Sequence, residues 1–190
     1  MALRELIEKN RSYRRFVQSH PIERGKLEEM VDLARLSASA ANLQPLKYYL
    51  SNDARTNRQI FDCLAWAAYL KDWPGPSEGE RPSAYILILG DTTISKNVIC
   101  DQGIAAQSIL LGAVEQSIGG CIVATIRKKK LAAALSLPEQ YEIMLVIALG
   151  KPAETVEIEN MDSDGNIKYW RDEHQVHHVP KRSLAEIILN

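Results

Sequence analysis

The segment from Ile94 to Ile118 constrains the fold more than any other part of this 190-residue chain. Its apolar side chains surround a helix instead of forming one stripe, and Asp101 and Gln107 interrupt them. A helix of this kind belongs in the middle of a protein or of an assembly. Gly119-Gly120 follows and ends it, because glycine readily adopts the backbone conformation that terminates helices. The sequence therefore predicts one long helix, apolar on most sides, over residues 94–118.

Two continuous apolar runs, Ala84–Gly90 and Ile143–Leu149, predict buried strands of a small central sheet. Further strands are expected over residues 46–50 and 121–124, and helices over residues 2–9, after Pro21, after Asp53 and over residues 127–135. Residues 1–190 contain neither an internal repeat nor a linker. We therefore expect a single α+β domain with several helices around the sheet.

The segment after residue 152 changes in character. Val156–Glu159 and Ile167–Trp170 flank Asp164-Gly165, which is the sequence pattern of a type I′ β-hairpin. Beyond it, Val179–Leu189 is expected to end in a short helix.

Composition excludes several classes of protein. Lys and Arg number 23 and Asp and Glu number 24, so no overall positive field exists for binding nucleic acid. The run Ile143–Leu149 is far shorter than the ~20 apolar residues of a membrane helix, and Met1–Asn10 lacks the apolar core of a secretory signal. Cys63, Cys100 and Cys121 are too widely separated for a disulfide framework or a cysteine-based zinc site. We therefore expect a protein of the reducing cytoplasm.

The first basic segment is Arg11-Ser12-Tyr13-Arg14-Arg15. In an extended chain Arg11 and Arg15 share one side, with Ser12 and Arg14 on the other. Guanidinium groups and a hydroxyl can then face a small anion. On composition alone, a solvated basic turn that pairs with nearby glutamates is the favoured interpretation.

A second basic segment, Val179-Pro180-Lys181-Arg182-Ser183-Leu184, places two cations before the predicted short helix. That arrangement suits a phosphate clamp, and it equally suits a solvated helix start.

Two other segments could contact a ligand. Ser39-Ala40-Ala41-Asn42-Leu43-Gln44-Pro45 offers a hydroxyl and two amides that can read the edge of a heteroaromatic ring, although an ordinary polar loop is favoured when it is taken alone. In Gly119-Gly120-Cys121-Ile122-Val123-Ala124, glycine lets the backbone approach a ligand closely. A tight helix-to-strand turn explains the same glycines equally well.

The sequence gives little support for a metal site or for a nucleotide-binding motif. His174, His177 and His178 have no Cys or carboxylate at a recognised spacing, so we predict no metal site. The sequence contains no G-x-S-x-G, P-loop or G-x-G-x-x-G motif, so a serine hydrolase and a Rossmann dinucleotide site have no support.

Taken in order, these segments resemble the nitroreductase family of FMN-dependent oxidoreductases. The resemblance covers nearly the whole chain and rests on residues 11–16, 39–45, the helix containing Asp101, residues 119–121, Leu149-Gly150-Lys151-Pro152 and residues 179–182. It implies an α+β fold with a central, mostly antiparallel sheet surrounded by helices. It also implies an intertwined homodimer with two FMN sites at the subunit interface, in which the apolar segment 94–118 forms the dimer core.

The resemblance implies cofactor contacts in four groups, namely Arg11, Ser12 and Arg14; Ser39, Asn42 and Gln44; Val123 and Ala124; and Lys181 and Arg182. The first group matches the family's N-terminal flavin-binding motif, and the last matches cations at the FMN phosphate. The second group matches a loop that the other subunit lends to the flavin, and the third matches backbone that passes the flavin N5 edge. Asn10 departs from the pattern, because many members have an arginine there.

The implied activity is an oxidoreduction with ping-pong kinetics. NADH or NADPH delivers hydride to FMN N5 and leaves, and a nitroaromatic, quinone or similar small-molecule acceptor then takes the electrons. No catalytic side chain is expected, because solvent can protonate the product. The alternatives are a nitroreductase-fold flavoprotein with reductive dehalogenation or dehydrogenation chemistry, a module that binds FMN without turnover, and a structural dimer without ligand.

Overall fold

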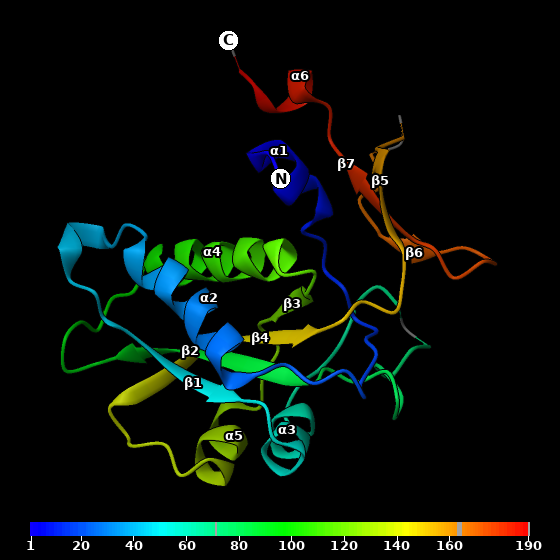
Figure 1. Ribbon diagram of the computed structural model, residues 1–190. Coiled ribbons are helices and arrows are strands. Elements are labelled where there is room, and N and C mark those ends of the chain that lie inside the picture. The colour runs from blue at the N-terminus through cyan, green and yellow to red at the C-terminus, as the bar shows by residue number, and fades with distance from the viewer. Residues whose placement is uncertain (71, 163–164, 190) are drawn as a thin grey trace.

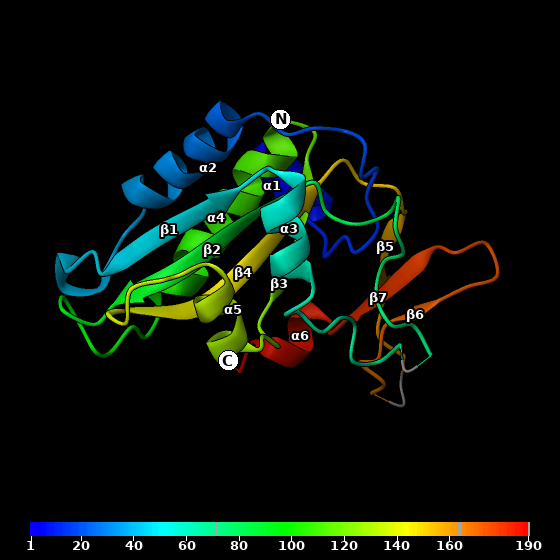
Figure 2. The same cartoon turned by 90° about the horizontal axis from the view of Figure 1, so that it is seen from below.

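The computed structural model describes residues 1–70, 72–162 and 165–189. Its main sheet is antiparallel throughout, in the order β1-β2-β4-β3, and helices cover both faces (Figures 1 and 2). The strands are β1 (Leu46–Ser51), β2 (Ala84–Asp91), β3 (Gly119–Val123) and β4 (Tyr141–Gly150). The two long apolar runs of the sequence thus form the central strands, as predicted.

Alternating side chains of β2 and β4 divide the core into two layers. Ile86, Ile88, Ile147 and Leu149 pack on one face with buried residues of α2 (Arg24–Leu36) and α4 (Asp101–Glu115). Tyr85, Leu87, Val146 and Ala148 pack on the other face with α3 (Ala54–Phe61) and α5 (Lys128–Ala134). None of the helices in the described ranges is long and apolar enough to cross a membrane.

Helix α4 is shorter than the sequence predicts, and it begins only at Asp101. The carboxylate of Asp91 accepts hydrogen bonds from the backbone N–H and the hydroxyl of Thr93, at 3.0 and 2.6 Å. These bonds hold a turn immediately before residue 94, where the predicted helix would begin. Ile99 is 77% exposed and Ile104 is 37% exposed, so one side of this region is not buried within a single chain.

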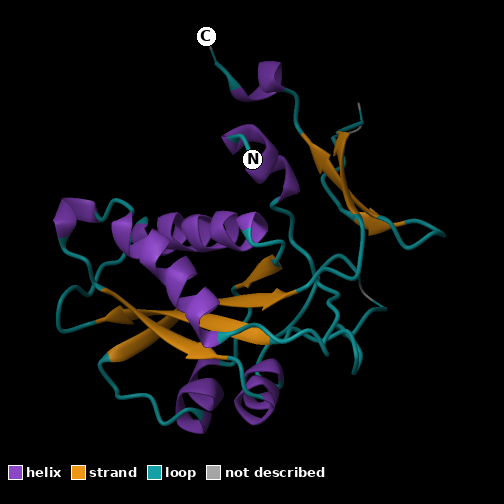
Figure 3. Cartoon of the chain, viewed as in Figure 1, coloured by secondary structure: helices purple, strands orange, loops and turns teal. Residues whose placement is uncertain are grey.

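The predicted hairpin after residue 155 is wrong in its pairing. The second sheet has the order β5-β7-β6, so β7 (His177–Lys181) separates β5 (Val156–Asn160) from β6 (Trp170–Arg171). β5 runs parallel to β7, and β6 runs antiparallel to it. Asp164 of the predicted turn lies outside the described residues. Figure 3 shows this small sheet standing apart from the main one, on the side where α1 (Leu3–Lys9) and α6 (Leu184–Ile187) lie.

The N-terminal segment after α1 is extended, as predicted, and joins the two sheets. Ser12 forms a parallel bridge with Gly120 of β3, and Phe16 forms an antiparallel bridge with Pro152. Phe16 is fully buried, and a Cβ at Gly150 would lie 2.7 Å from its ring, so only glycine fits there. This packing fixes residues 11–15 beside β3.

Candidate functional site

A hollow of about 300 Å³ lies beside β3, where the N-terminal segment meets β7. We call it the cation-lined hollow, and its lining residues are Asn10, Arg11, Ser12, Arg14, Gln107, Leu110, Gly120, Ile122, Tyr169, His177, Val179 and Lys181. In the main sheet β3 pairs with β4 alone, so its other edge faces this hollow. Segments from both ends of the sequence therefore converge on one place.

Three cations line this hollow without a carboxylate partner. Within the described ranges, no Asp or Glu oxygen lies within 4.0 Å of the side-chain nitrogens of Arg11, Arg14 or Lys181. Neighbouring Arg15 and Arg171, by contrast, pair with Glu80 and Glu154. Uncompensated cations that share one hollow favour an anionic ligand there.

Arg11 carries an unsatisfied donor. Its Nη2 donates to the carbonyl oxygen of Ile7 at 2.7 Å, whereas its Nε is buried and has no hydrogen-bond partner in the part of the chain that is described. Burial lowers the pKa of this guanidinium, and the coulombic effect of Tyr13 partly offsets that. A ligand oxygen would satisfy the free donor, because buried polar groups are normally hydrogen-bonded.

Arg14 is held from several sides. The carboxylate of Glu154 accepts the backbone N–H of Arg14. The Arg14 Nη1 lies 3.2 Å from the carbonyl oxygen of Ser12 and 3.2 Å from Nε2 of His177, and the guanidinium carbon lies 4.8 Å from the centre of the Tyr169 ring. These contacts keep one cation in a fixed place at the edge of the hollow.

His177 supports Arg14 as a neutral acceptor. It is buried, and burial, followed by the charges of Arg14, Arg171 and His178, lowers its pKa to about 4. Because an arginine can only donate, Nε2 of the neutral ring accepts from Arg14 and the ring proton sits on Nδ1. That Nδ1 is buried without a partner among the described residues.

A second hollow, of about 220 Å³, adjoins the first along the same strand. We call it the β3 hollow, and its lining residues are Arg14, Ala65, Trp66, Ala67, Ala68, Cys121, Ile122, Val123, Ala124 and Thr125. Arg14 and Ile122 line both hollows. The two hollows therefore form one groove that is cationic at one end and largely apolar at the other.

The groove brings together six of the residues that the sequence singles out, namely Arg11, Ser12, Arg14, Val123, Ala124 and Lys181. Arg182 lies outside both linings, and its Nη1 pairs with Glu186 at 3.6 Å. Strand alternation accounts for this, because His177, Val179 and Lys181 share the face of β7 that lines the hollow.

The polar loop of residues 39–44 lies elsewhere in the chain. Ser39 and Gln44 line a separate hollow of about 220 Å³ at the N-terminal end of α4, and Asn42 is exposed nearby. Asp101 fixes the loop, because its carboxylate accepts from the Ser39 hydroxyl at 2.5 Å and from the Ala40 N–H at 3.0 Å. The resemblance assigns this loop to the flavin of the other subunit, and that assignment stays a prediction.

Backbone strain marks the same loop. Ala41, Asn42 and Gln44 have φ angles of +49°, +54° and +51°, a conformation that side chains with a Cβ rarely adopt. Strain of this kind persists only where the surroundings hold it, and it concentrates at ligand sites.

Close packing explains the glycine at position 120. A Cβ there would lie 2.5 Å from the side chain of Leu110 and 3.0 Å from the carbonyl oxygen of Ala148. Of the two explanations that the sequence leaves open, the helix-to-strand contact is therefore sufficient by itself, although Gly120 also lines the cation-lined hollow.

The three clustered histidines occupy different surroundings. His177 lies in the cation-lined hollow, and His174 is exposed beside Glu173. The Nδ1 of His178 contacts the carboxylate of Glu159, and its Nε2 lies 3.2 Å from Oδ2 of Asp172. The ring of His178 stacks on Trp170. These contacts raise the pKa of His178, the hydrogen bond to Asp172 most of all.

Sequence reasoning missed two residues that build this site. The sequence around Glu154 predicts an ordinary surface glutamate after Pro152, yet the side chain of Glu154 is 2% exposed. The sequence suggests for His177 only a possible role as a metal ligand. Treating residues 177–181 as a strand would have placed it on one face with Lys181.

Comparison with known proteins identifies the family. The model of the nitroreductase family matches residues 7–151, so the chain belongs to that family and has its α+β fold. A nitroreductase family protein from Clostridium novyi NT shares 22% identity, with 98% of each chain covered and a TM-score of 0.66. One from Streptococcus pneumoniae TIGR4 shares 16% identity over 98% of each chain, with a TM-score of 0.71. An FMN-dependent nitroreductase from Clostridium difficile R20291 shares 21% identity over 88% of this chain and 97% of its own, with a TM-score of 0.67.

Proposed function

We propose that this chain is an FMN-dependent oxidoreductase that uses NADH or NADPH to reduce small acceptors such as nitroaromatics or quinones. One observation carries the proposal: Arg11, Arg14 and Lys181 come from opposite ends of the chain and line one hollow that contains no carboxylate. A phosphate monoester bears nearly two negative charges at neutral pH, and these cations would offset them. Membership of the nitroreductase family supports oxidoreductase chemistry in this fold.

The donor set fits the phosphate and ribityl part of FMN. Ser12 adds a hydroxyl and Asn10 an amide to the cations, and the buried Nε of Arg11 lacks an acceptor among the described residues. Arg11 can therefore donate to a phosphate oxygen without giving up its bond to Ile7. Lys181 is exposed and adds a point charge at the mouth of the hollow.

The β3 hollow fits the ring system. Ile122, Val123 and Ala124 present strand backbone and small apolar side chains, and Trp66 adds an aromatic wall. When bound, FMN supplies the hydride chemistry, since it can accept hydride from a nicotinamide and pass electrons to an acceptor. The residues that line the β3 hollow would hold the ring system and exclude water from it.

Arg14 would set the electrostatics of the ring. It lines both hollows, so its charge lies between the phosphate end and the ring end of the groove. A fixed cation there favours negative charge in the adjacent ring and so favours its reduction. Neutral His177 holds the guanidinium in place without adding a second charge.

We infer that the working form is a homodimer. Apolar side chains are exposed on α1, α4 and α6, and they include Leu3, Ile7, Ile104, Leu184 and Ile187. Large apolar side chains that are exposed in numbers on a single chain favour an interaction surface. A partner on this surface would also bring in the strained loop of residues 39–44, which in one chain lies away from the groove.

An anaerobic titration of the purified protein tests the function. We expect yellow protein whose flavin is bleached by NADH or NADPH and recovers its colour when a nitroarene or quinone is added. Bound flavin that neither nicotinamide reduces would instead favour an FMN-binding module. Turnover of a halogenated phenol but not of a nitroarene would favour dehalogenation, and colourless protein that fails to bind added FMN would contradict the proposal.

A further inference from the structure

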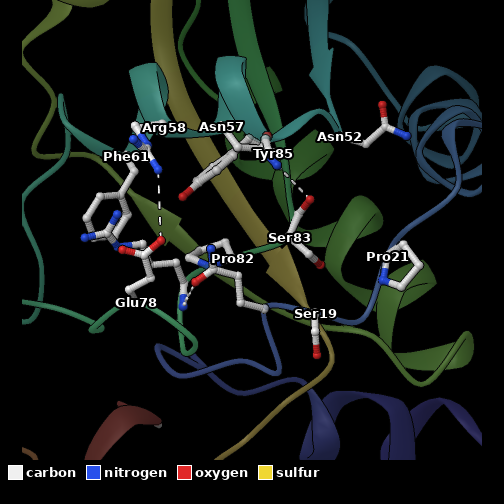
Figure 4. Close-up of a pocket in the computed structure, with 13 residues that line it drawn as sticks. Ser19, Pro21, Asn52, Asn57, Arg58, Phe61, Glu78, Pro82, Ser83 and Tyr85 are labelled. Atoms are coloured by element: carbon white, nitrogen blue, oxygen red, sulfur yellow. Dashed lines mark hydrogen bonds and ion pairs between the residues drawn. The ribbon is translucent and has the colours of Figure 1, made fainter.

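A fourth hollow lies on the opposite side of the main sheet from α2 and α4. It has a volume of about 290 Å³ and is formed by α3, the start of β2 and the loop segments 18–21 and 78–82 (Figure 4). We call it the α3 hollow. None of its lining residues belongs to the cation-lined hollow or the β3 hollow, so the proposed flavin site does not use it.

Tyr85 brings a hydroxyl without a hydrogen-bond partner to the α3 hollow. The residue as a whole is 1% exposed, and its hydroxyl makes no hydrogen bond to any described residue. Tyrosine residues that are buried to this extent usually place the hydroxyl against a partner. In Figure 4 this hydroxyl points toward the side of the hollow where Phe61 and Glu78 lie. Burial raises the pKa of Tyr85, so the hydroxyl keeps its proton and can donate it.

Two more donors beside Tyr85 are also unsatisfied. The Ser83 hydroxyl and the Nε of Arg81 are buried and without partners in the described part of the chain. Arg81 has no carboxylate within 4.0 Å there, and its guanidinium carbon lies 4.3 Å from the centre of the Phe61 ring. The groups around Tyr85 without a partner among the described residues are thus a guanidinium and two hydroxyls.

Asn57, Arg58 and Glu78, which also line the hollow, already have partners. The side-chain amide of Asn57 donates to the Ser83 carbonyl at 2.8 Å and accepts from the Ser51 hydroxyl at 2.7 Å. Arg58 pairs with Glu78 at 4.0 Å, so one charge of the hollow is offset and the charge of Arg81 is not. A ligand that completes this site therefore has one negative charge and accepts several hydrogen bonds.

We propose that the α3 hollow binds a small monocarboxylate that carries a flat apolar group. One guanidinium fork matches a carboxylate in two parallel hydrogen bonds, and the Ser83 and Tyr85 hydroxyls complete its acceptor capacity. The rings of Phe61 and Tyr85 provide the surface for the flat group. Because Arg58 and Glu78 offset each other, the single remaining charge of Arg81 matches one carboxylate better than a doubly charged anion such as phosphate.

Calorimetric titration of the flavin-loaded protein with benzoate tests this site. We expect saturable binding that Arg81→Gln weakens roughly tenfold or more and that Tyr85→Phe and Ser83→Ala each weaken roughly threefold to tenfold. Lys128→Gln is the matched control, because Lys128 pairs with Glu142 outside the hollow and should leave benzoate binding unchanged. FMN content should remain the same in all four variants.

Tyr85→Phe keeps the test decisive even if Arg81→Gln folds poorly. It removes only a hydroxyl that has no partner, so we expect its melting temperature to equal or exceed that of the wild type. Absence of saturable benzoate binding would overturn the proposal, as would wild-type affinity in Tyr85→Phe and Ser83→Ala. Tighter binding of inorganic phosphate than of benzoate would overturn the ligand class.

Discussion

Glu154 and Arg171 form a buried ion pair in which Nη2 of Arg171 lies 2.9 Å from Oε2 of Glu154, with side chains 2% and 8% exposed. The other oxygen of the same carboxylate accepts the backbone N–H groups of Arg14 and Arg15. One side chain therefore ties the second sheet to the segment that lines the proposed flavin site.

Removal of this carboxylate should strongly destabilise the protein. Glu154→Ala leaves the Arg171 charge buried without a partner and frees two backbone donors, so we expect a loss of about 3–5 kcal/mol in the free energy of unfolding. Urea denaturation measures it. Asp32→Ala breaks the exposed pair with Arg35 and should leave stability nearly unchanged. Equal effects of the two substitutions would contradict the structural role of Glu154.

Acidification should destabilise the protein through His177. Its pKa is lowered from 6.5 to about 4, so the unfolded chain binds this proton more readily than the folded one. The stability that neutral His177 contributes is present above pH 6.5 and is lost as the pH falls toward about 4. The full loss is roughly 3 kcal/mol. Urea denaturation across this range should show a shallower decline in His177→Gln, whereas His174→Gln, at an exposed position, should match the wild type.

His178 should act in the opposite direction and in a different pH range. Its pKa is raised by the hydrogen bond to Asp172 and by Glu159, so the folded state holds the proton more tightly than the unfolded state. This stabilisation is complete below pH 6.5 and is lost as the pH rises through the raised pKa. Thermal melts from neutral to alkaline pH should therefore show a decline that His178→Gln reduces. An unchanged profile in this variant would exclude His178 as its source.

Lys181 and Arg182 should differ in their effect on FMN affinity. Lys181 lines the cation-lined hollow, so Lys181→Ala and Arg11→Ala should each raise the Kd for FMN roughly tenfold to a hundredfold. Arg182 pairs with Glu186 outside that lining, and we expect a smaller change from Arg182→Ala. Quenching of flavin fluorescence measures all three affinities. An equal loss in Arg182→Ala would assign that residue to the phosphate as well.

A charge on α6 should disrupt the proposed dimer. Leu184 and Ile187 are 69% and 60% exposed in a single chain, so burying Glu at either position against a partner is unfavourable. Light scattering after size exclusion should show a monomer for Ile187→Glu and a dimer for the wild type. Ala133→Glu, on the exposed face of α5 on the other side of the main sheet, should remain dimeric. A wild-type mass for Ile187→Glu and Leu184→Glu would exclude α6 from the interface.

Local patterns predicted most of the fold. The stripe of Leu27, Met30 and Ala34 gives α2 its buried side, and the Asp53 carboxylate accepts the Thr56 N–H at 2.8 Å at the start of α3. Such signals are contained in a few neighbouring residues. They failed where a distant or competing interaction decides the structure, as in the pairing of β5 with β7 and in the turn that Asp91 imposes before α4.

The candidate site was predictable in part for the same reason. The basic segments are visible in the sequence, and strand alternation would have separated Lys181 from its neighbours. The burial of Glu154 has no local signature, because it depends on Arg171 and on the backbone of Arg14, which lies 140 residues away.

The convergence of residues 11–14 with Lys181 also governs when the site can form during synthesis. A nascent chain that has emerged from the ribosome only as far as β4 already contains all four strands of the main sheet. It still lacks the segment that brings His177 and Lys181 to the N-terminal arginines. Capture of the proposed cofactor would therefore be a late event in biogenesis, and translation that halts within the second sheet would yield a product with a complete main sheet and an incomplete cation-lined hollow.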